Sequence, residues 1–125
     1  MKKVLISKIG LDGHEVGARM IYQLLNKNGF EVEYLGIRQK IEDVIKKAEE
    51  FKPDAIGISI MTGAHNYFLP KLRKALDKEN MKHIKLICGG LIPEKDKEKL
   101  MKSVDMIFDN NSNINEILKY FQECI

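Results

Sequence analysis

Five short apolar runs, each followed by a segment of helical period, constrain the fold of this chain more than any other feature. The runs are rich in Val, Ile and Leu and occupy residues 2–8, 31–36, 54–59, 84–89 and 105–109. The helical segments fall near residues 16–28, 41–51, 64–79, 94–102 and 113–123. Apolar strands that alternate with helices are typical of a parallel sheet covered on both faces.

This alternation predicts an α/β fold. Five such units in 125 residues favour a doubly wound five-stranded parallel sheet of flavodoxin-like (Rossmann-like) order 2-1-3-4-5 with right-handed crossovers. Gly29 in "KNGF" suits a left-handed cap at the end of the first helix, and Pro53 in "KPD" stops the second. Because the chain shows no linker and no internal repeat, we expect residues 1–125 to form a single domain.

Three loops carry the unusual residues of the chain. In an open α/β sheet, ligands bind beyond the carboxyl ends of the strands at the point where strand order reverses, here between the first and third strands. "GLDGHEVG" follows the first strand, "SIMTGAH" the third and "GGLIP" the fourth. Since these three loops share one edge of the predicted sheet, we expect the functional site there.

Each of these loops also has a purely structural interpretation when it is taken singly. A turn, a solvent-facing loop position, a close-packed helix position or a strand end would explain each residue without a ligand. The residues concerned are Asp12, Gly13, His14, Gly17, Ser59, Gly89 and Gly90. Only their convergence on one edge of the sheet favours a binding site.

His14 is the candidate metal ligand in this set. A metal-bound imidazole usually donates its other N–H to a carboxylate, and Asp12 lies two residues away across a flexible glycine. Lys8, at the end of the first strand, could hold Asp12 ionised. No second His, Cys or acid stands at ligand spacing, so a bare zinc or iron ion held by protein alone is disfavoured. A single protein ligand suits a metal that arrives with its own ligands.

These residues carry a resemblance to a known family. "DGHEVG" resembles the D-x-H-x-x-G signature of the cobalamin-binding domains of adenosylcobalamin-dependent mutases, and "SIM" and "GG" fall where that family has its S-x-L and Gly-Gly motifs. Over nearly its whole length the chain looks like the carboxy-terminal domain of methylmalonyl-CoA mutase. The small subunit of glutamate mutase is a more distant relation.

The resemblance implies how the cofactor would be held. In this family the nucleotide tail leaves the cobalt, and the motif histidine, here His14, becomes the lower axial ligand. Asp12 would accept a hydrogen bond from its second nitrogen, and Lys8 would extend that relay. The displaced tail would thread into an apolar slot beside the third and fourth strands.

Small residues would make room for that tail. Gly17 would let it pass the first helix, Ser59 would bond a benzimidazole nitrogen, and Gly89 with Gly90 would leave space. The resemblance also implies cofactor contacts from Gly13, Val16 and Met61, and Met61 stands where relatives commonly have Leu. "FDNNSN", residues 108–113, departs from the Gly-rich turn that relatives often carry, so the family's tail contacts from this turn are not carried over to this chain.

The function implied is that of a cobalamin-binding small subunit of an adenosylcobalamin-dependent carbon-skeleton mutase acting on methylmalonyl-CoA or a similar acyl-CoA. The cofactor supplies the radical chemistry, so no catalytic residue is expected in this chain. Because the chain is too short for a barrel of about 250 residues, a large barrel-type subunit must hold the substrate. The cofactor would lie between the two subunits, and this chain alone would lack mutase activity.

Two other classes share parts of this pattern. A corrinoid carrier for a methyltransferase or a cobalamin sensor would use the same His14 geometry, but methyl-transferring carriers usually add a helical bundle ahead of this domain. A phosphoacceptor receiver domain shares the strand order, yet it needs an Asp at the end of the third strand and a Lys near the fifth. "GISIM" and "IFDNN" occupy those places, which argues against a receiver.

Charge and cysteine usage set the remaining limits. The formal net charge of +3 is spread over helices in which acids and bases alternate, so no nucleic-acid partner is indicated. No apolar stretch approaches about 18 residues, so no membrane span is expected. Cys88 and Cys124 lie far apart without metal or disulfide spacing, which favours a reducing cytoplasm.

Overall fold

The computed structural model describes residues 2–9, 16–60, 65–90, 92–108 and 112–125. Within these residues, strands and helices alternate strictly along the chain, as the sequence pattern predicts. Their bounds are β1 Lys3–Ile9, α1 Val16–Lys27, β2 Glu31–Gln39, α2 Ile41–Phe51, β3 Ala55–Ile60, α3 His65–Lys78, β4 Lys85–Gly90, α4 Glu94–Leu100, β5 Met106–Phe108 and α5 Ile114–Cys124.

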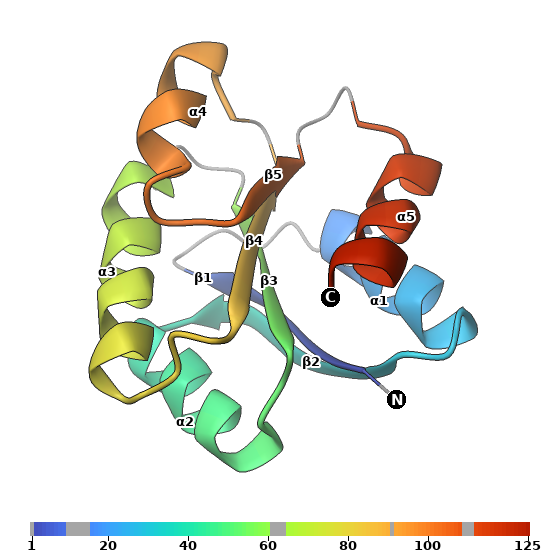
Figure 1. Ribbon diagram of the computed structural model, residues 1–125, viewed down its shortest axis with the longest axis horizontal. Coiled ribbons are helices and arrows are strands. Elements are labelled where there is room, and N and C mark those ends of the chain that lie inside the picture. The colour runs from blue at the N-terminus through green and yellow to red at the C-terminus, as the bar shows by residue number, and fades with distance from the viewer. Residues whose placement is uncertain (1, 10–15, 61–64, 91, 109–111) are drawn as a thin grey trace.

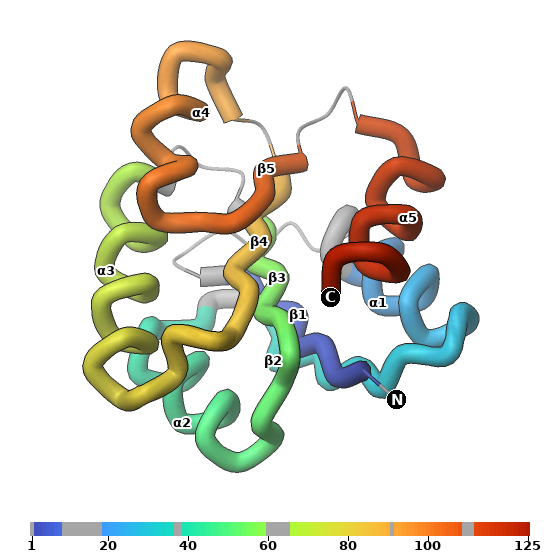
Figure 2. The backbone as a smooth tube through the Cα atoms, viewed as in Figure 1, coloured from blue at the N-terminus to red at the C-terminus, as the bar shows by residue number. Residues whose placement is uncertain are grey.

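The strands form one parallel sheet of order β2-β1-β3-β4-β5. Helices α1 and α5 cover one face of this sheet, and α2, α3 and α4 cover the other (Figures 1 and 2). The predicted doubly wound fold and its strand order are therefore confirmed. The order reverses between β1 and β3, which places the switch point at the carboxyl ends of those two strands.

The largest boundary error concerns β2, which continues three residues beyond the predicted end at residue 36. Gly36 adopts a φ of +108°, and the pairing of β1 with β2 shifts register next to it. A glycine in this conformation forms a bulge without steric cost, so the strand continues and Gln39 pairs with Ile9. At the other edge, β5 starts at Met106 and not at residue 105, and the Asp105 carboxylate before it accepts a hydrogen bond from the Leu86 amide at 2.8 Å.

The predicted helix stops are confirmed. Gly29 has a φ of +88°, and the Phe30 amide beyond it donates to the Leu25 carbonyl at 3.1 Å, which closes the end of α1. At the end of α2, Lys52 takes the left-handed conformation and its amide donates to the Ala48 carbonyl before Pro53 prevents continuation. The remaining helix bounds agree with the prediction to within two residues.

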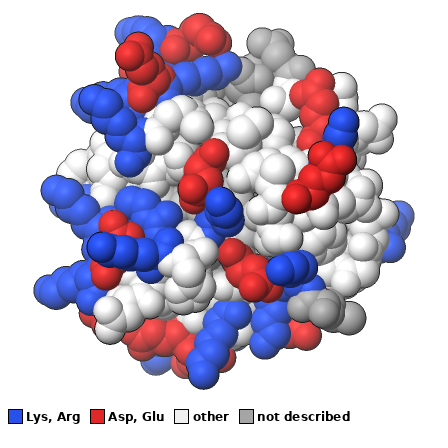
Figure 3. Space-filling model, in the orientation of Figure 1, with Lys and Arg blue, Asp and Glu red and all other residues white. Residues whose placement is uncertain are grey.

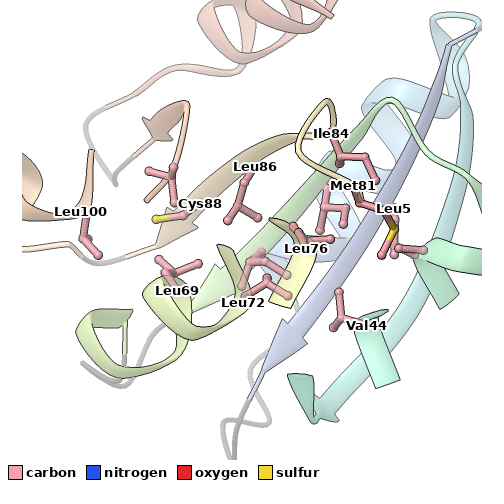
Figure 4. Close-up of a cluster of buried hydrophobic side chains, with 14 of the residues drawn as sticks. Leu5, Val44, Leu69, Leu72, Leu76, Met81, Ile84, Leu86, Cys88 and Leu100 are labelled. Carbon is pink, nitrogen blue, oxygen red and sulfur yellow. The ribbon is translucent and has the colours of Figure 1, made fainter. Parts of the chain in front are cut away.

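Two hydrophobic clusters fill the space on either side of the sheet. The first joins the sheet to α2, α3 and α4 through large aliphatic side chains, with Leu72 and Leu76 of α3 completely buried (Figure 4). The second lies under α1 and α5 and contains Val4, Ile6, Leu25, Phe30, Ala55, Ile87, Phe108 and Phe121. Successive residues of β1 alternate between the two clusters, as expected for a strand buried on both faces.

Charged side chains of both signs lie next to one another on the face shown in Figure 3. Pairs such as Lys97 with Glu94 at 2.8 Å and Lys47 with Glu33 at 3.0 Å show the same interleaving. In the described ranges, every helix is too short or too polar to cross a membrane.

The two cysteines should differ sharply in reactivity. Cys88 is fully buried in the first cluster, and burial raises the pKa of its thiol to about 12, whereas Cys124 is exposed at the end of α5. Because only the thiolate attacks, we expect a disulfide reagent at mildly alkaline pH to modify Cys124 rapidly and Cys88 only after unfolding. Absorbance of the released thiol measures both phases. The Cys124→Ser variant should show no rapid phase, and equal rates for the two thiols would contradict this assignment.

Candidate functional site

The pairing of the strands brings three of the predicted site residues side by side. Lys8 of β1 pairs with Ser59 of β3, and Ser59 pairs with Gly89 of β4. Paired residues of neighbouring parallel strands share a face, and Ile6, two residues before Lys8, belongs to the second cluster. These three residues therefore lie at the carboxyl edge on the face covered by α1 and α5.

Lys8 is completely buried at this edge. Its ammonium group donates to the Ser59 backbone carbonyl and to the Ser59 hydroxyl, with both donor–acceptor distances at 3.3 Å. An ammonium group removed from water is costly unless acceptors surround it, so these two oxygens stabilise the charged side chain. The sequence prediction placed both residues in the site but did not foresee that they contact each other.

Gly57 was missed by the sequence analysis, and it has a packing role on the same face. A Cβ atom at this position would come within 2.9 Å of Ile6 Cδ1, a contact too close for a real side chain. The glycine thus lets the buried Ile6 side chain lie across β3. Ala55, Gly57 and Ser59 point to the same face because alternate residues of a strand do so. On this face, β3 therefore carries only small side chains from Ala55 to its carboxyl end.

Gly89 has no comparable packing explanation. A Cβ atom there would lie 3.4 Å from the Phe108 carbonyl oxygen, which is an ordinary contact distance, and its φ is not in the left-handed region. The described residues around Gly89 therefore leave room for a Cβ atom at this position. A glycine that neither packing nor backbone conformation requires fits a surface that a ligand approaches closely.

Gly90 differs, because its φ of +134° is a conformation that other residues rarely adopt. The backbone at the end of β4 therefore requires glycine whether or not a ligand is present. Backbone conformation therefore explains the glycine at position 90 but not the glycine at position 89.

Aromatic side chains close the sheet face beyond Gly89. Phe108 pairs with Gly89 across β4 and β5, and its ring meets that of Tyr120 on α5 edge to face at a centroid distance of 5.6 Å. Burial raises the pKa of the Tyr120 phenol, with further contributions from Asp105 and Cys124, so the phenol stays neutral. This edge of the face is apolar and packed through α5.

Several predicted site residues lie outside the described residues. These are Asp12, Gly13, His14 and Met61. Val16 and Gly17 form the first two residues of α1, so the helix starts directly after the D-x-H segment, as predicted. Of the loop at residues 108–113, Asn113 is described, and its side chain accepts from the Glu116 amide at 2.9 Å as the cap of α5. The spacing of Asn113 and Glu116 was a capping signal that the sequence analysis overlooked.

Another concave region lies away from this edge. A groove of about 380 Å³ is lined by Arg19, Tyr22, Gln23, Val32, Glu33 and Tyr34, between α1 and the edge strand β2. The Arg19 guanidinium stacks over the Tyr34 ring at 5.6 Å, and the Tyr22 ring approaches it at 6.2 Å. These contacts make the groove part of the packing of α1 on β2.

Comparison with known families decides what kind of site this is. The sequence profile described as the B12 binding domain matches residues 2–118. The chain belongs to the B12-binding domain family. The predicted cofactor class, a cobalt corrinoid, is thereby confirmed.

Relatives among characterised proteins carry mutase names. The chain is 36% identical over 124 residues to the pivalyl-CoA mutase small subunit of Xanthobacter autotrophicus, covering 98% of this chain and 80% of that protein. It is 32% identical over 124 residues to the methylmalonyl-CoA mutase of Cereibacter sphaeroides, of which it spans only 18%. The predicted likeness to a portion of methylmalonyl-CoA mutase is confirmed.

Solved structures share the fold. A cobalamin-binding protein from Desulfitobacterium hafniense superimposes with a TM-score of 0.86 over 99% of this chain and 59% of its own, at 22% sequence identity. At this level of identity the likeness supports the fold.

The two adjacent glycines should respond differently to substitution. We expect Gly90→Ala to lower the free energy of unfolding by about 1–3 kcal/mol, because its backbone would be strained. We expect Gly89→Ala to change it by less than about 1 kcal/mol, because the added Cβ makes only ordinary contacts. Urea unfolding followed by circular dichroism measures both values. An equal loss in the two variants would show that Gly89 is also required by the fold.

Proposed function

We propose that this chain is the cobalamin-binding small subunit of an adenosylcobalamin-dependent acyl-CoA carbon-skeleton mutase of the methylmalonyl-CoA mutase type. The observation that carries the proposal is the match to a protein named as a small subunit, which extends over 98% of this chain and 80% of that protein. The described residues fit the cofactor, since a buried ammonium group bonded to Ser59 and a glycine that neither packing nor φ requires share one face of the sheet.

His14 is the proposed lower axial ligand of the cobalt. A neutral imidazole suits a transition metal, and the carboxylate of Asp12 would fix its tautomer by accepting from the second ring nitrogen. The buried Lys8 ammonium at the end of β1 would keep Asp12 ionised, because a nearby positive charge favours the carboxylate form. These three residues would hold the corrinoid in one orientation over the sheet edge.

The nucleotide tail of the cofactor is proposed to lie along the small residues of the α1 and α5 face. Ser59 would donate to the benzimidazole nitrogen, while Gly17 and Gly89 would let the tail come close to α1 and β4. Gly13, Val16, Met61 and Gly90 are the further proposed contacts. Gly89 supports this placement, since neither its packing nor its φ explains the missing side chain.

When bound, adenosylcobalamin supplies an organic radical that starts the rearrangement of the substrate. The proposed role of this chain is to bind the cofactor, orient its reactive face and exclude water from its lower face. A large barrel-type subunit is the proposed partner that holds the acyl-CoA, so the cofactor would lie between that barrel and the edge bearing His14. Cytoplasmic location remains part of this proposal.

A non-catalytic corrinoid carrier or cobalamin sensor is the alternative. Such a protein would need the same ligand and tail site, and the superposition on the Desulfitobacterium hafniense protein is compatible with it. The higher identity to a mutase small subunit favours the mutase proposal. The partner experiment below separates the two.

Ligation by His14 can be tested by electron paramagnetic resonance. We expect the purified chain with cobalamin reduced to Co(II) to show nitrogen superhyperfine splitting that changes when its histidines carry nitrogen-15. The reason is that the axial nitrogen would come from the protein and not from the cofactor's own base. His14→Ala should abolish the dependence on the label.

His83→Ala is the matched control, because His83 is exposed and lies before the amino end of β4, far along the strand from the proposed site. It should leave the labelled spectrum unchanged. Persistence of the label effect in His14→Ala, or bound cobalamin with its own base still on the metal, would refute the ligand assignment.

Dependence on a larger partner is the second test. We expect the chain loaded with adenosylcobalamin to leave methylmalonyl-CoA and pivalyl-CoA unchanged, because the substrate site belongs to the other subunit. A tagged chain expressed in its native cell should retain a larger protein, and adding that protein should restore isomerisation of an acyl-CoA, as measured by chromatography. Retention of a methyltransferase, or of no protein while cobalamin binds, would favour the carrier or sensor.

A further inference from the structure

Lys8 and Ser59 together determine the direction of a hydrogen bond at the site edge. A lysine ammonium has three donors and no acceptor, so the Ser59 hydroxyl oxygen must accept from it at 3.3 Å. The hydroxyl proton is then left to point to another acceptor. The Lys8 ammonium also donates to the backbone carbonyl of Ser59 at 3.3 Å, which is the acceptor nearest in sequence to the Ser59 hydroxyl.

We infer that Lys8 fixes the Ser59 hydroxyl as a hydrogen-bond donor toward the tail, so that this chain selects corrinoids whose lower base carries an unprotonated ring nitrogen. The inference rests on the proposed placement of the tail beside Ser59. Lys8 is thus a positioning residue that acts on tail selectivity, in addition to its proposed role beside Asp12. A hydroxyl that accepts from a cation is also a stronger donor, because hydrogen bonds in a chain polarise one another.

The burial of Lys8 and Ser59 strengthens the proposed hydrogen bond from Ser59 to the tail. Lys8 has no solvent exposure, and Ser59 is partly buried, so water competes weakly for the hydroxyl proton. A lower base without a ring nitrogen, such as the phenolic base of a p-cresolyl cobamide, would cover the partly buried Ser59 hydroxyl and leave its proton without an acceptor. Sites built to hydrogen-bond a ligand group discriminate against an analogue that lacks it for this reason.

The test compares two cofactors on one set of variants. Hydroxocobalamin has a benzimidazole nitrogen, whereas p-cresolyl cobamide has none, and binding of each to the purified chain at neutral pH is measured by titration calorimetry. Each variant is compared with the unchanged chain for the same cofactor, so the cost of detaching the base from the metal cancels. Any effect of Lys8 through Asp12 and His14 acts on both cofactors and cancels as well.

We expect Ser59→Ala to weaken hydroxocobalamin binding by about 3- to 10-fold more than p-cresolyl cobamide binding, the effect of one hydrogen bond. Lys8→Met should also weaken hydroxocobalamin binding more than p-cresolyl cobamide binding. In the double variant, the difference between the two losses should be no larger than in Ser59→Ala alone. Circular dichroism checks that the variants fold. If Lys8→Met does not fold, Lys8→Gln makes the same comparison, since its amide offers both a donor and an acceptor and no longer fixes the hydroxyl.

Ser7→Ala is the matched control. Ser7 is also fully buried, lies next to Lys8 in β1, and its hydroxyl has no hydrogen-bond partner among the residues that the structure describes. Because alternate residues of a strand face opposite sides, its removal should leave both affinities unchanged. Equal losses for the two cofactors in Lys8→Met or in Ser59→Ala would overturn the inference while leaving the proposed function intact. Failure of the unchanged chain to bind either cofactor would overturn both.

Discussion

The hydrogen bonds from the buried Lys8 ammonium to Ser59 join the two strands between which the sheet reverses its order. An ion taken out of water without partners costs on the order of several kcal/mol. The carboxyl ends of β1 and β3 are therefore held in the register that gives the ammonium its two oxygens. Two of the three loops that carry the predicted motifs start from these strand ends, so one buried contact holds the starting points of both.

The two faces of the sheet carry different tasks because their side chains differ in size. The face under α2, α3 and α4 is filled by Leu and Ile side chains that are almost completely buried, which provides much of the apolar stabilisation. On the opposite face, β3 carries only small side chains up to its carboxyl end, Ala55, Gly57 and Ser59, while its neighbours β1 and β4 carry the larger Ile6 and Ile87 there. The second cluster packs most of this face as well, so only the carboxyl end of β3, where the side chains are small, is left for the proposed nucleotide tail.

The helices, the strands and the edge at the switch point were predictable from sequence, because local sequence patterns determine them. Apolar runs, a glycine cap at Gly29 and the proline stop at Pro53 give the elements, and a switch-point rule gives the edge at which ligands bind. The extension of β2 was not predictable, since it depends on pairing with β1 beyond a bulge at Gly36. The clash that explains Gly57 and the contact between Lys8 and Ser59 likewise depend on register across strands distant in sequence.

The resemblance added what the local patterns could not: the assignment of His14 to cobalt and of the small residues to a nucleotide tail. His14 lies outside the described residues, whereas two of the small residues, Gly89 and Gly90, are described. The structure separates Gly89, whose missing side chain has no packing cause, from Gly90, which its backbone requires.

The position of Lys8 connects the two halves of the proposed cofactor site. Its ammonium has three protons, and Ser59 takes two of them through its carbonyl and hydroxyl oxygens. In the proposed site the Asp12 carboxylate takes another, so one buried charge would orient both the group that meets the tail and the group that steadies the axial histidine. The site would then be organised before the cofactor arrives, because a buried ammonium must find its acceptors in the folded protein whether or not cobalamin is bound.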